Sequence, residues 1–196
     1  TKEIERSKDV VTMKSIKIIT LLIITLFLLS CGGKTMTNKT ATFHTSLGTI
    51  EIELFEEEMP ITTENFIKLA KEGFYDGTKF HRVIPGFMVQ GGDPLSADDS
   101  KKNAWGTGGP GYSIKDEFDK SLSNSPGTIA MANAGPNTGG SQFFVNLVNN
   151  NFLDSKHPVF GKVVSGMDVV ESIGNVKTGQ ADRPVEDVVI EKIIIK

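Results

Sequence analysis

The feature that most limits the fold of this chain is a series of short strand-like segments interrupted by only two short helix-like ones. Residues 41–55 predict a hairpin, because apolar residues alternate there with acidic ones. The pattern gives about eight strands in all, and the helix-like segments at 60–74 and 166–174 stand far apart. Strands and helices therefore do not alternate as a parallel sheet requires. We expect a mainly β fold, a closed eight-stranded antiparallel β-barrel capped by two short α-helices, since closure removes exposed strand edges.

The first of these helices has recognisable end signals. Pro60 is typical of a first helical turn, and Thr62 or Thr63 is the expected cap. Gly73 is expected to end the helix after about three turns.

Residues 13–30 predict a secretory signal peptide. Lys14 and Lys17 precede an apolar run of about 12 residues, whereas a helix that spans a bilayer needs about 20. The sequence LLSC at the end of this run resembles the bacterial lipoprotein box, which implies a lipid on Cys31 and anchoring in the bacterial cell envelope, outside the cytoplasm. The alternatives are a short uncleaved anchor and an unprocessed free thiol. Cys31 is the only cysteine, so no disulfide can form within the chain.

These signals divide the chain into four parts. Residues 1–12 look like an upstream extension that does not belong to the fold. Residues 13–30 are the lipoprotein signal peptide, and residues 31–40, rich in Gly, Thr, Lys and Asn, are a flexible tether. Residues 41–196 are the folded domain.

Charge and motifs exclude several functions. The formal net charge is -3 and no basic stripe is present, so nucleic acid is not an expected partner. The sequence has no G-x-S-x-G, H-E-x-x-H or P-loop pattern. The segment 106–111, GTGGPG, matches G-x-G-x-x-G only formally, because it contains a proline and opens no helix; a mobile loop is the preferred interpretation. His44, His81 and His157 are scattered, so no metal site is expected.

The segment 80–94, FHRVIPGFMVQGGDP, predicts two short strands around the turn at 85–86. Alternation would place Arg82 on one face with Phe80 and Ile84. By the same rule Gln90 would share a face with Met88. A cation among apolar side chains is unfavourable unless it has a partner or a function, so this arginine is either part of a structural ion pair or a functional residue.

The segment 131–144, MANAGPNTGGSQFF, indicates a place where a peptide can lie. Its small residues, Ala132, Ala134 and Gly135, would allow another backbone to approach, and Asn133 would offer main-chain hydrogen-bonding groups at a strand edge. An ordinary long hairpin loop is the alternative.

These two segments, followed by FLDSKHPVFGKV at 152–163, resemble the cyclophilin family of peptidyl-prolyl cis-trans isomerases over nearly all of residues 41–196. The resemblance, in a bacterial lipoprotein form, implies that Arg82 is catalytic. It implies further site residues: Phe87, Met88, Phe144 and Leu153 around the substrate proline, His157 at the rim, Gln90 and Gln142 beside the arginine, Ala132, Asn133 and Ala134 along the substrate backbone, and Gly106 in the flanking loop. Proline-containing peptides and folding proteins are the implied partners of a monomer that needs no cofactor and no metal, and the membrane is reached only through the N-terminal lipid.

Two positions depart from well-known members of the family. Phe152 stands where many members have tryptophan, so the substrate pocket stays apolar but loses an N–H donor that would favour binding of the inhibitor cyclosporin. The loop after residue 94 carries an extra polar stretch, Leu95 to Ala104.

The expected function is therefore acceleration of X-Pro rotation in extracytoplasmic proteins. Two other functions remain open on the sequence: a module of the same fold that grips proline segments without turnover, and an unrelated envelope β-barrel that carries a small ligand. Turnover of a proline peptide would separate the first from the expected enzyme, and any affinity for proline peptides would exclude the second.

Overall fold

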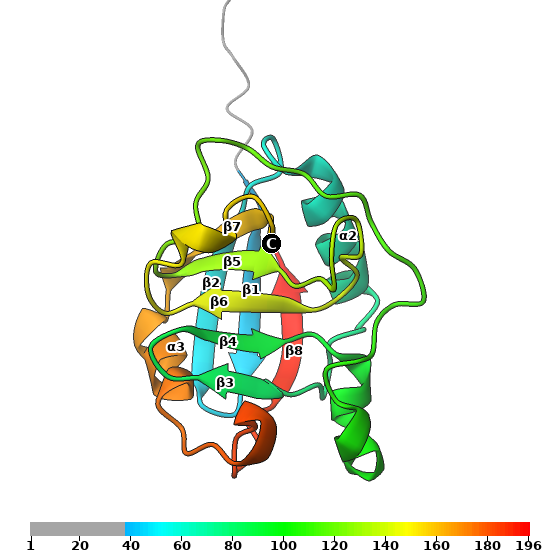
Figure 1. The fold of residues 1–196 in the computed structure, drawn as a ribbon, viewed down its shortest axis with the longest axis vertical. Coiled ribbons are helices and arrows are strands. Elements are labelled where there is room, and N and C mark those ends of the chain that lie inside the picture. Colours follow the sequence, from blue (N-terminus) through cyan, green and yellow to red (C-terminus); the bar gives the residue numbers. More distant parts are fainter. Residues whose placement is uncertain (1–37) are drawn as a thin grey trace, which may run out of the picture. The chain divides into compact units, whose positions relative to one another are not determined.

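The computed structural model describes residues 38–196, which form a single sheet of eight antiparallel strands (Figure 1). In chain order the strands are β1 (Thr40–Thr45), β2 (Gly48–Leu54), β3 (Arg82–Ile84), β4 (Met88–Gly91), β5 (Thr128–Met131), β6 (Phe143–Asn146), β7 (Val159–Ser165) and β8 (Ile190–Ile195). Their spatial order is β3-β4-β6-β5-β7-β2-β1-β8. The predicted mainly β fold with eight antiparallel strands is confirmed.

The predicted closure of the barrel is wrong. Strands β3 and β8 are the two ends of the sheet and do not pair with each other. Between them lie only the bridge from Lys79 to Val189 and flanking hydrogen bonds, such as the 3.0 Å bond from Phe80 N to Val188 O. The cause is length, because β3 has three residues and the chain before it turns at Gly77, with φ +75°, leaving few extended residues to complete a ladder. The result is an open half-barrel.

The sheet curls so that its two halves face each other. In Figure 1, β3, β4, β6 and β5 run across the front while β2, β1 and β8 cross behind them at a steep angle. The main core fills the space between the halves and is built around one aromatic cluster: Phe43, Phe66, Tyr75, Phe80, Phe143 and Phe160. Phe80 was expected on the face of Arg82 but lies in this core, 1% exposed, because regular alternation begins only at Arg82.

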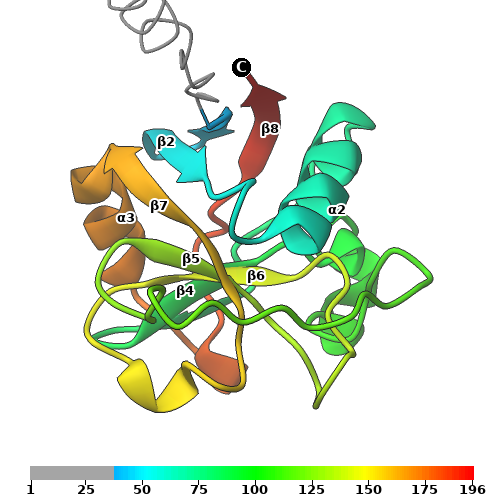
Figure 2. The same cartoon turned by 90° about the horizontal axis from the view of Figure 1, so that it is seen from above.

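Within residues 38–196, two α-helices flank the sheet, as predicted. They are α2 (Pro60–Lys71), beside β8, and α3 (Met167–Gly174), beside β2, and Figure 2 shows β4, β5 and β6 as a layer between them. Short 3-10 helices occupy the loops: η1 (Pro94–Ala97), η2 (Asp99–Ala104), η3 (Asn151–Leu153) and η4 (Gln180–Asp182).

Helix α2 begins at Pro60 as predicted, but its cap is not a threonine. Both Thr62 and Thr63 are buried, and the N-cap residue makes no side-chain hydrogen bond. Instead the carboxylate of Glu117 accepts from Ile61 N at 3.0 Å and from Thr62 N at 2.7 Å. A carboxylate there also complements the positive end of the helix dipole. The first turn of α2 is thus tied to the loop that leads to β5.

The turn at η4 is strained. Ala181 and Asp182 have φ of 60° and 57°, in the left-handed region that non-glycine residues rarely adopt. A small hairpin holds the turn, in which Gly179 N donates to Arg183 O at 2.7 Å and Val185 N to Lys177 O at 2.8 Å.

We expect Ala181→Gly to raise the free energy of unfolding by about 1 kcal/mol, because glycine adopts positive φ without the steric cost of a Cβ. The midpoint of urea denaturation measures the change. The same substitution at Ala104, whose φ is not positive, is the matched control and is expected to lower stability. A lower midpoint for Ala181→Gly would show that the turn is not strained.

The predicted signal peptide, Cys31 and most of the predicted tether lie outside the described residues. Among residues 38–196, no helix is both long and apolar enough to cross a membrane.

Candidate active site

A second apolar cluster lies on the outer face of β4, β5 and β6. Along these strands one set of alternate residues, such as Val89, Ile129 and Val145, enters the main core. The other set forms a separate cluster of buried residues, Met88, Ala130, Phe144 and Val159, against which Ile84, Phe87, Ala132 and Leu153 pack. The structure thus brings together the four residues predicted around the substrate proline: Phe87, Met88, Phe144 and Leu153.

Arg82 lies in register with this cluster. It pairs with Gln90 across β3 and β4, Gln90 pairs with Phe144 across β4 and β6, and Phe144 pairs with Ala130 across β5. Side chains directly opposite each other on neighbouring strands are about 5 Å apart and share a face. The arginine therefore stands at the edge of the sheet, on the face that carries the apolar cluster and two strands from its aromatic ring.

A chain of side-chain hydrogen bonds connects the arginine to the flanking loop. Arg82 Nη1 donates to Gln90 Oε1 at 3.4 Å, and Gln90 Nε2 donates to Gln142 Oε1 at 3.0 Å. Gln142 Nε2 donates in turn to the carbonyl oxygens of Gly106 at 3.1 Å and Gly108 at 2.8 Å. Both glutamines are thus neighbours in the arginine's hydrogen-bond network, and Gly106 is part of it.

At the edge predicted to bind a peptide backbone, fewer main-chain groups are free than expected. Ala132 N donates to Gln142 O at 2.9 Å and Ala134 N donates to Thr138 Oγ1 at 2.8 Å, so both N–H groups are already used. Within residues 38–196, no hydrogen bond involves the main-chain N–H or C=O of Asn133. Asn133 is therefore the residue of this edge that offers both groups, next to a cavity of about 510 Å³ lined by residues from 106–113 and 132–134.

The rim of the apolar cluster comes from the segment around η3. His157 packs edge-on against Phe144 at 5.5 Å between ring centroids, and its Nδ1 lies 3.1 Å from Met131 O. Phe152 stacks on Phe87 at 6.1 Å but remains 65% exposed. An aromatic ring at position 152 thus covers the outer side of Phe87 without entering the cluster.

A buried asparagine network, not found from the sequence, holds this rim in place. Asn146 Nδ2 donates to Asn124 Oδ1 at 3.1 Å and Asn150 Nδ2 donates to Asn146 Oδ1 at 2.8 Å. Asp154 accepts from Asn124 N at 2.7 Å. Buried amides need such partners, yet the sequence around an asparagine gives no sign of which partner it will find.

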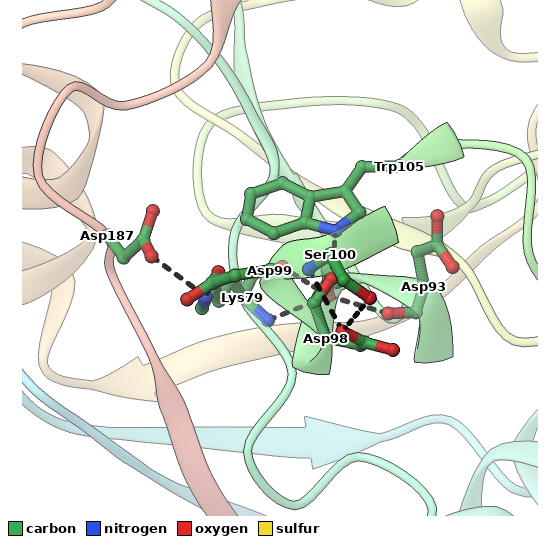
Figure 3. Close-up of polar contacts among 8 residues, drawn as sticks. Lys79, Asp93, Asp98, Asp99, Ser100, Trp105 and Asp187 are labelled. Atoms are coloured by element: carbon green, nitrogen blue, oxygen red, sulfur yellow. Dashed lines mark hydrogen bonds and ion pairs between the residues drawn. The ribbon is translucent and has the colours of Figure 1, made fainter. Parts of the chain in front are cut away.

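The extra polar stretch after residue 94 is structured. It forms η1 and η2 around Trp105, which is 8% exposed and donates from Nε1 to Asp98 O at 3.1 Å. Figure 3 shows Asp187, from the segment before β8, pointing toward Lys79, whose Nζ lies 2.8 Å from it and also pairs with Asp99. Burial alone lowers the pKa of Lys79, but its hydrogen bonds and charge interactions with Asp187 and Asp99 outweigh burial and raise it. The stretch is thereby tied to the start of β8.

Asp93 fixes the loop that holds Gly106. Its side chain is fully buried, accepts from Leu95 N at 2.7 Å and also accepts from Gly106 N. Gly106 has φ +93°, and Gly108 approaches the Asp93 carboxylate so closely that a Cβ would lie 2.1 Å from Oδ1. The G-x-G spacing of this segment therefore serves a tight turn on a carboxylate, and a dinucleotide-binding helix is absent here.

The family model for the cyclophilin type peptidyl-prolyl cis-trans isomerases matches residues 40–195. The chain belongs to the cyclophilin family. The predicted class of enzyme, an isomerase of the cyclophilin type, is thereby confirmed.

Related proteins agree with this assignment. The chain is 50% identical over 153 residues to the peptidyl-prolyl cis-trans isomerase CYP71 of Arabidopsis thaliana, with 78% of the chain covered but only 24% of that longer protein. It is 48% identical over 156 residues to the peptidyl-prolyl cis-trans isomerase ppi1 of Schizosaccharomyces pombe, covering 76% of the chain and 94% of the relative. The cyclophilin domain here thus spans about a quarter of the Arabidopsis relative and nearly all of the yeast one.

Solved structures share the fold. A cyclophilin type peptidyl-prolyl cis-trans isomerase of Cryptosporidium parvum superposes with a TM-score of 0.74 at 31% identity, covering 81% of this chain and 98% of that one. A structure of the same protein determined in the presence of the dipeptide Ala-Pro gives a TM-score of 0.73, again at 31% identity, covering 80% and 98% of the two chains.

Among residues 38–196 of this cyclophilin, no group of three or more His, Cys, Asp or Glu side chains is placed to hold a metal ion. His81 lies beneath Gly106 and is 4% exposed, with no hydrogen-bond partner at either ring nitrogen within the described residues. Burial is the main cause that holds the pKa of His81 below its ordinary value of 6.5, and the nearby arginines, Arg183 and Arg82, add to this against an opposing effect of Asp93.

This lowered pKa predicts a pH-dependent stability. A histidine whose pKa is lower in the folded than in the unfolded state contributes stability above pH 6.5, which is lost as the pH falls below 6.5 toward the folded-state pKa. We expect the free energy of unfolding of the parent to fall as the pH is lowered below 6.5, and that of His81→Leu to fall less. Urea denaturation at a series of pH values measures both, and equal slopes would contradict the prediction.

Proposed function

We propose that this cyclophilin accelerates rotation about X-Pro bonds, with Arg82 as its catalytic residue. The observation that supports the proposal is the row formed by Arg82, Gln90 and Phe144 across three adjacent strands, because residues in such a row share the face of the sheet that carries the apolar cluster. The proline ring would pack on Phe87, Met88, Phe144 and Leu153, with His157 and Phe152 at the rim. The residue before the proline would bind the free main-chain groups of Asn133.

The chemistry requires no nucleophile. An X-Pro bond turns over in tens to hundreds of seconds unaided, because amide resonance sets a barrier of about 18–20 kcal/mol. Raising a rate of about 0.01 per second to about 1000 per second requires about 7 kcal/mol of stabilisation of the transition state. As the amide twists, its nitrogen regains a lone pair, which a positioned guanidinium can meet with a hydrogen bond that the planar ground state does not offer.

The side chains around Arg82 suit this role. Arginine stays charged at every relevant pH and presents its donors in a planar fork. Gln90 occupies only Nη1, at 3.4 Å, and Gln142 in turn fixes Gln90. Nη2 has no hydrogen-bond partner among residues 38–196, so a donor remains for the substrate nitrogen.

Two-dimensional exchange spectroscopy on a peptide containing Ala-Pro tests the proposal. The protein at a small fraction of the peptide concentration should produce cis-trans exchange cross-peaks, which an unassisted bond is too slow to give. Binding of the peptide, seen as shifted resonances without exchange, would instead support a module that grips proline segments. If the peptide shows neither shifted resonances nor exchange, both the isomerase and the binding module are ruled out.

We further propose that the substrates are extracytoplasmic proteins and that the chain is a bacterial lipoprotein anchored through Cys31. The support is the sequence of residues 13–31, with its two lysines, short apolar run and terminal LLSC. One acyl chain gives only marginal membrane binding, so stable anchoring needs the several chains of a lipidated cysteine. Mass spectrometry of the protein from its native membrane tests this, because an N-terminus other than an acylated Cys31 would overturn the lipoprotein proposal while leaving the isomerase proposal intact.

A further inference from the structure

The carboxylate of Asp182 forms an ion pair with Arg82, which was one of the two expectations for this arginine, although its partner could not be predicted. Asp182 Oδ2 lies 3.5 Å from Arg82 Nε, and both side chains are about half exposed, at 49% and 44%. Gln90 contacts the other end of the guanidinium, at Nη1. One contact comes from the sheet and one from η4, and within residues 38–196 Nη2 has no hydrogen-bond partner.

The backbone that carries Asp182 is held in an unfavourable conformation. Two consecutive non-glycine residues, Ala181 and Asp182, have positive φ. Strain of this kind persists only where the surroundings enforce it, and it is concentrated at functional sites. Here the residue in this conformation is the one whose carboxylate reaches Arg82 on β3.

The surroundings that enforce this turn lie on the polar stretch around Trp105. The guanidinium of the next residue, Arg183, lies 5.0 Å from the centroid of the indole ring. The ring is fixed in turn by its hydrogen bond to Asp98 O and by Lys79, 4.7 Å from the centroid. Lys79 also binds Asp187, five residues after Asp182, so the segment that follows the turn is anchored at two points, Arg183 and Asp187.

We propose that Asp182 is a positioning residue for Arg82, a role that rests on the proposed isomerase function. A half-exposed arginine has many rotamers, and each must be given up when the guanidinium meets the twisted amide. An ion pair at Nε fixes the plane of the guanidinium beforehand, so this loss occurs on folding and not on each turnover. The orientation therefore stabilises the transition state more than the ground-state complex, because only the twisted amide accepts a hydrogen bond from the guanidinium.

The Asp182 carboxylate could also lower activity, so the direction in which its removal changes the rate distinguishes two roles. A carboxylate beside the guanidinium reduces the local positive potential, which by itself would weaken the hydrogen bond to the amide nitrogen. If orientation dominates, removing the charge lowers activity. If neutralisation dominates, removing it raises activity.

The test compares the parent with Asp182→Asn, Asp182→Glu and the control Glu186→Gln. Asparagine has nearly the same shape and tolerates positive φ, so the turn is kept while the charge is lost. Glu186 is exposed, belongs to the same segment and makes no ion pair among the described residues, so its substitution removes one charge without touching Arg82. Exchange spectroscopy gives the rotation rate on the enzyme and the peptide Kd separately.

We expect Asp182→Asn to rotate the bound peptide about threefold to fivefold more slowly, the range that half-exposed ion pairs produce, with its Kd and thermal midpoint unchanged. Asp182→Glu should restore part of the rate, and Glu186→Gln should match the parent. The Nε resonance of Arg82 should shift in Asp182→Asn alone.

Each other result overturns the inference. An unchanged or higher rate in Asp182→Asn would show that the carboxylate does not position the arginine, and a changed Kd with an unchanged rate would assign it to substrate binding. These outcomes differ from failure of the proposed function, in which the parent itself would give no exchange.

Discussion

Replacing Arg82 with alanine should lower kcat/KM for an Ala-Pro peptide by about a hundredfold to a thousandfold. This is the loss that follows removal of one well-placed donor to a developing charge, equivalent to about 3–4 kcal/mol of transition-state stabilisation. The apolar cluster around Phe144 does not depend on this side chain, so the peptide Kd should change by less than about threefold. A protease-coupled assay at low substrate concentration measures kcat/KM, and peptide titration followed by NMR measures Kd.

Two further variants separate charge from geometry in this experiment. Arg82→Lys keeps the charge but loses the planar fork, so it should recover only a small part of the activity. Lys192→Ala, on β8, removes a cation from an exposed position far along the sheet order and should retain parental activity. Parental kcat/KM in Arg82→Ala would rule out the proposed mechanism, even if the protein is an isomerase.

The second large effect concerns stability. Phe143 is fully buried and contacts four other aromatic rings, with centroids 5.6 to 6.5 Å away: Phe43, Phe66, Tyr75 and Phe80. Replacing it with alanine removes these contacts and leaves a cavity that the crowded cluster cannot close. We expect the free energy of unfolding to fall by about 3–5 kcal/mol, a large share of the stability of a typical domain.

Urea denaturation measures this loss, with Phe118→Ala as the matched control. Phe118 is 49% exposed, so the same change in side chain should alter stability by no more than about 0.5 kcal/mol. If Phe143→Ala does not fold, Phe143→Leu, which preserves more of the volume, should show a smaller loss of the same sign. Equal midpoints for the parent and both Phe143 variants would contradict the assignment of this residue to the centre of the core.

The local pattern of the sequence predicted the geometry around Arg82 well. The turn at Pro85 and Gly86 fixes the register of β3 against β4, and that register alone places Arg82 opposite Gln90. Where the pattern was irregular it misled, since the position of Phe80 was inferred from an alternation that had not yet begun. The prediction of a closed barrel was wrong for a related reason, because the number of strands does not show whether the two end strands are long enough to pair.

Contacts between distant segments could not be predicted in this way. Glu117 caps a helix that begins at Pro60, and Asp182 reaches Arg82 from a turn a hundred residues later in the chain. Nothing in their local sequence distinguishes these carboxylates from other surface acids. Their partners depend on tertiary packing, which the local pattern of a single sequence does not reveal.

The open seam between β3 and β8 has a consequence for how the arginine works. Arg82 is carried by a strand with one neighbour, whereas the apolar cluster lies on strands bonded on both sides. Backbone at the margin of a sheet shifts with the least loss of hydrogen bonding. The strand that carries the arginine is therefore more easily displaced than the strands beneath the apolar cluster, so the contacts of Arg82 with Gln90 and Asp182 must supply the rigidity that a second neighbouring strand would give.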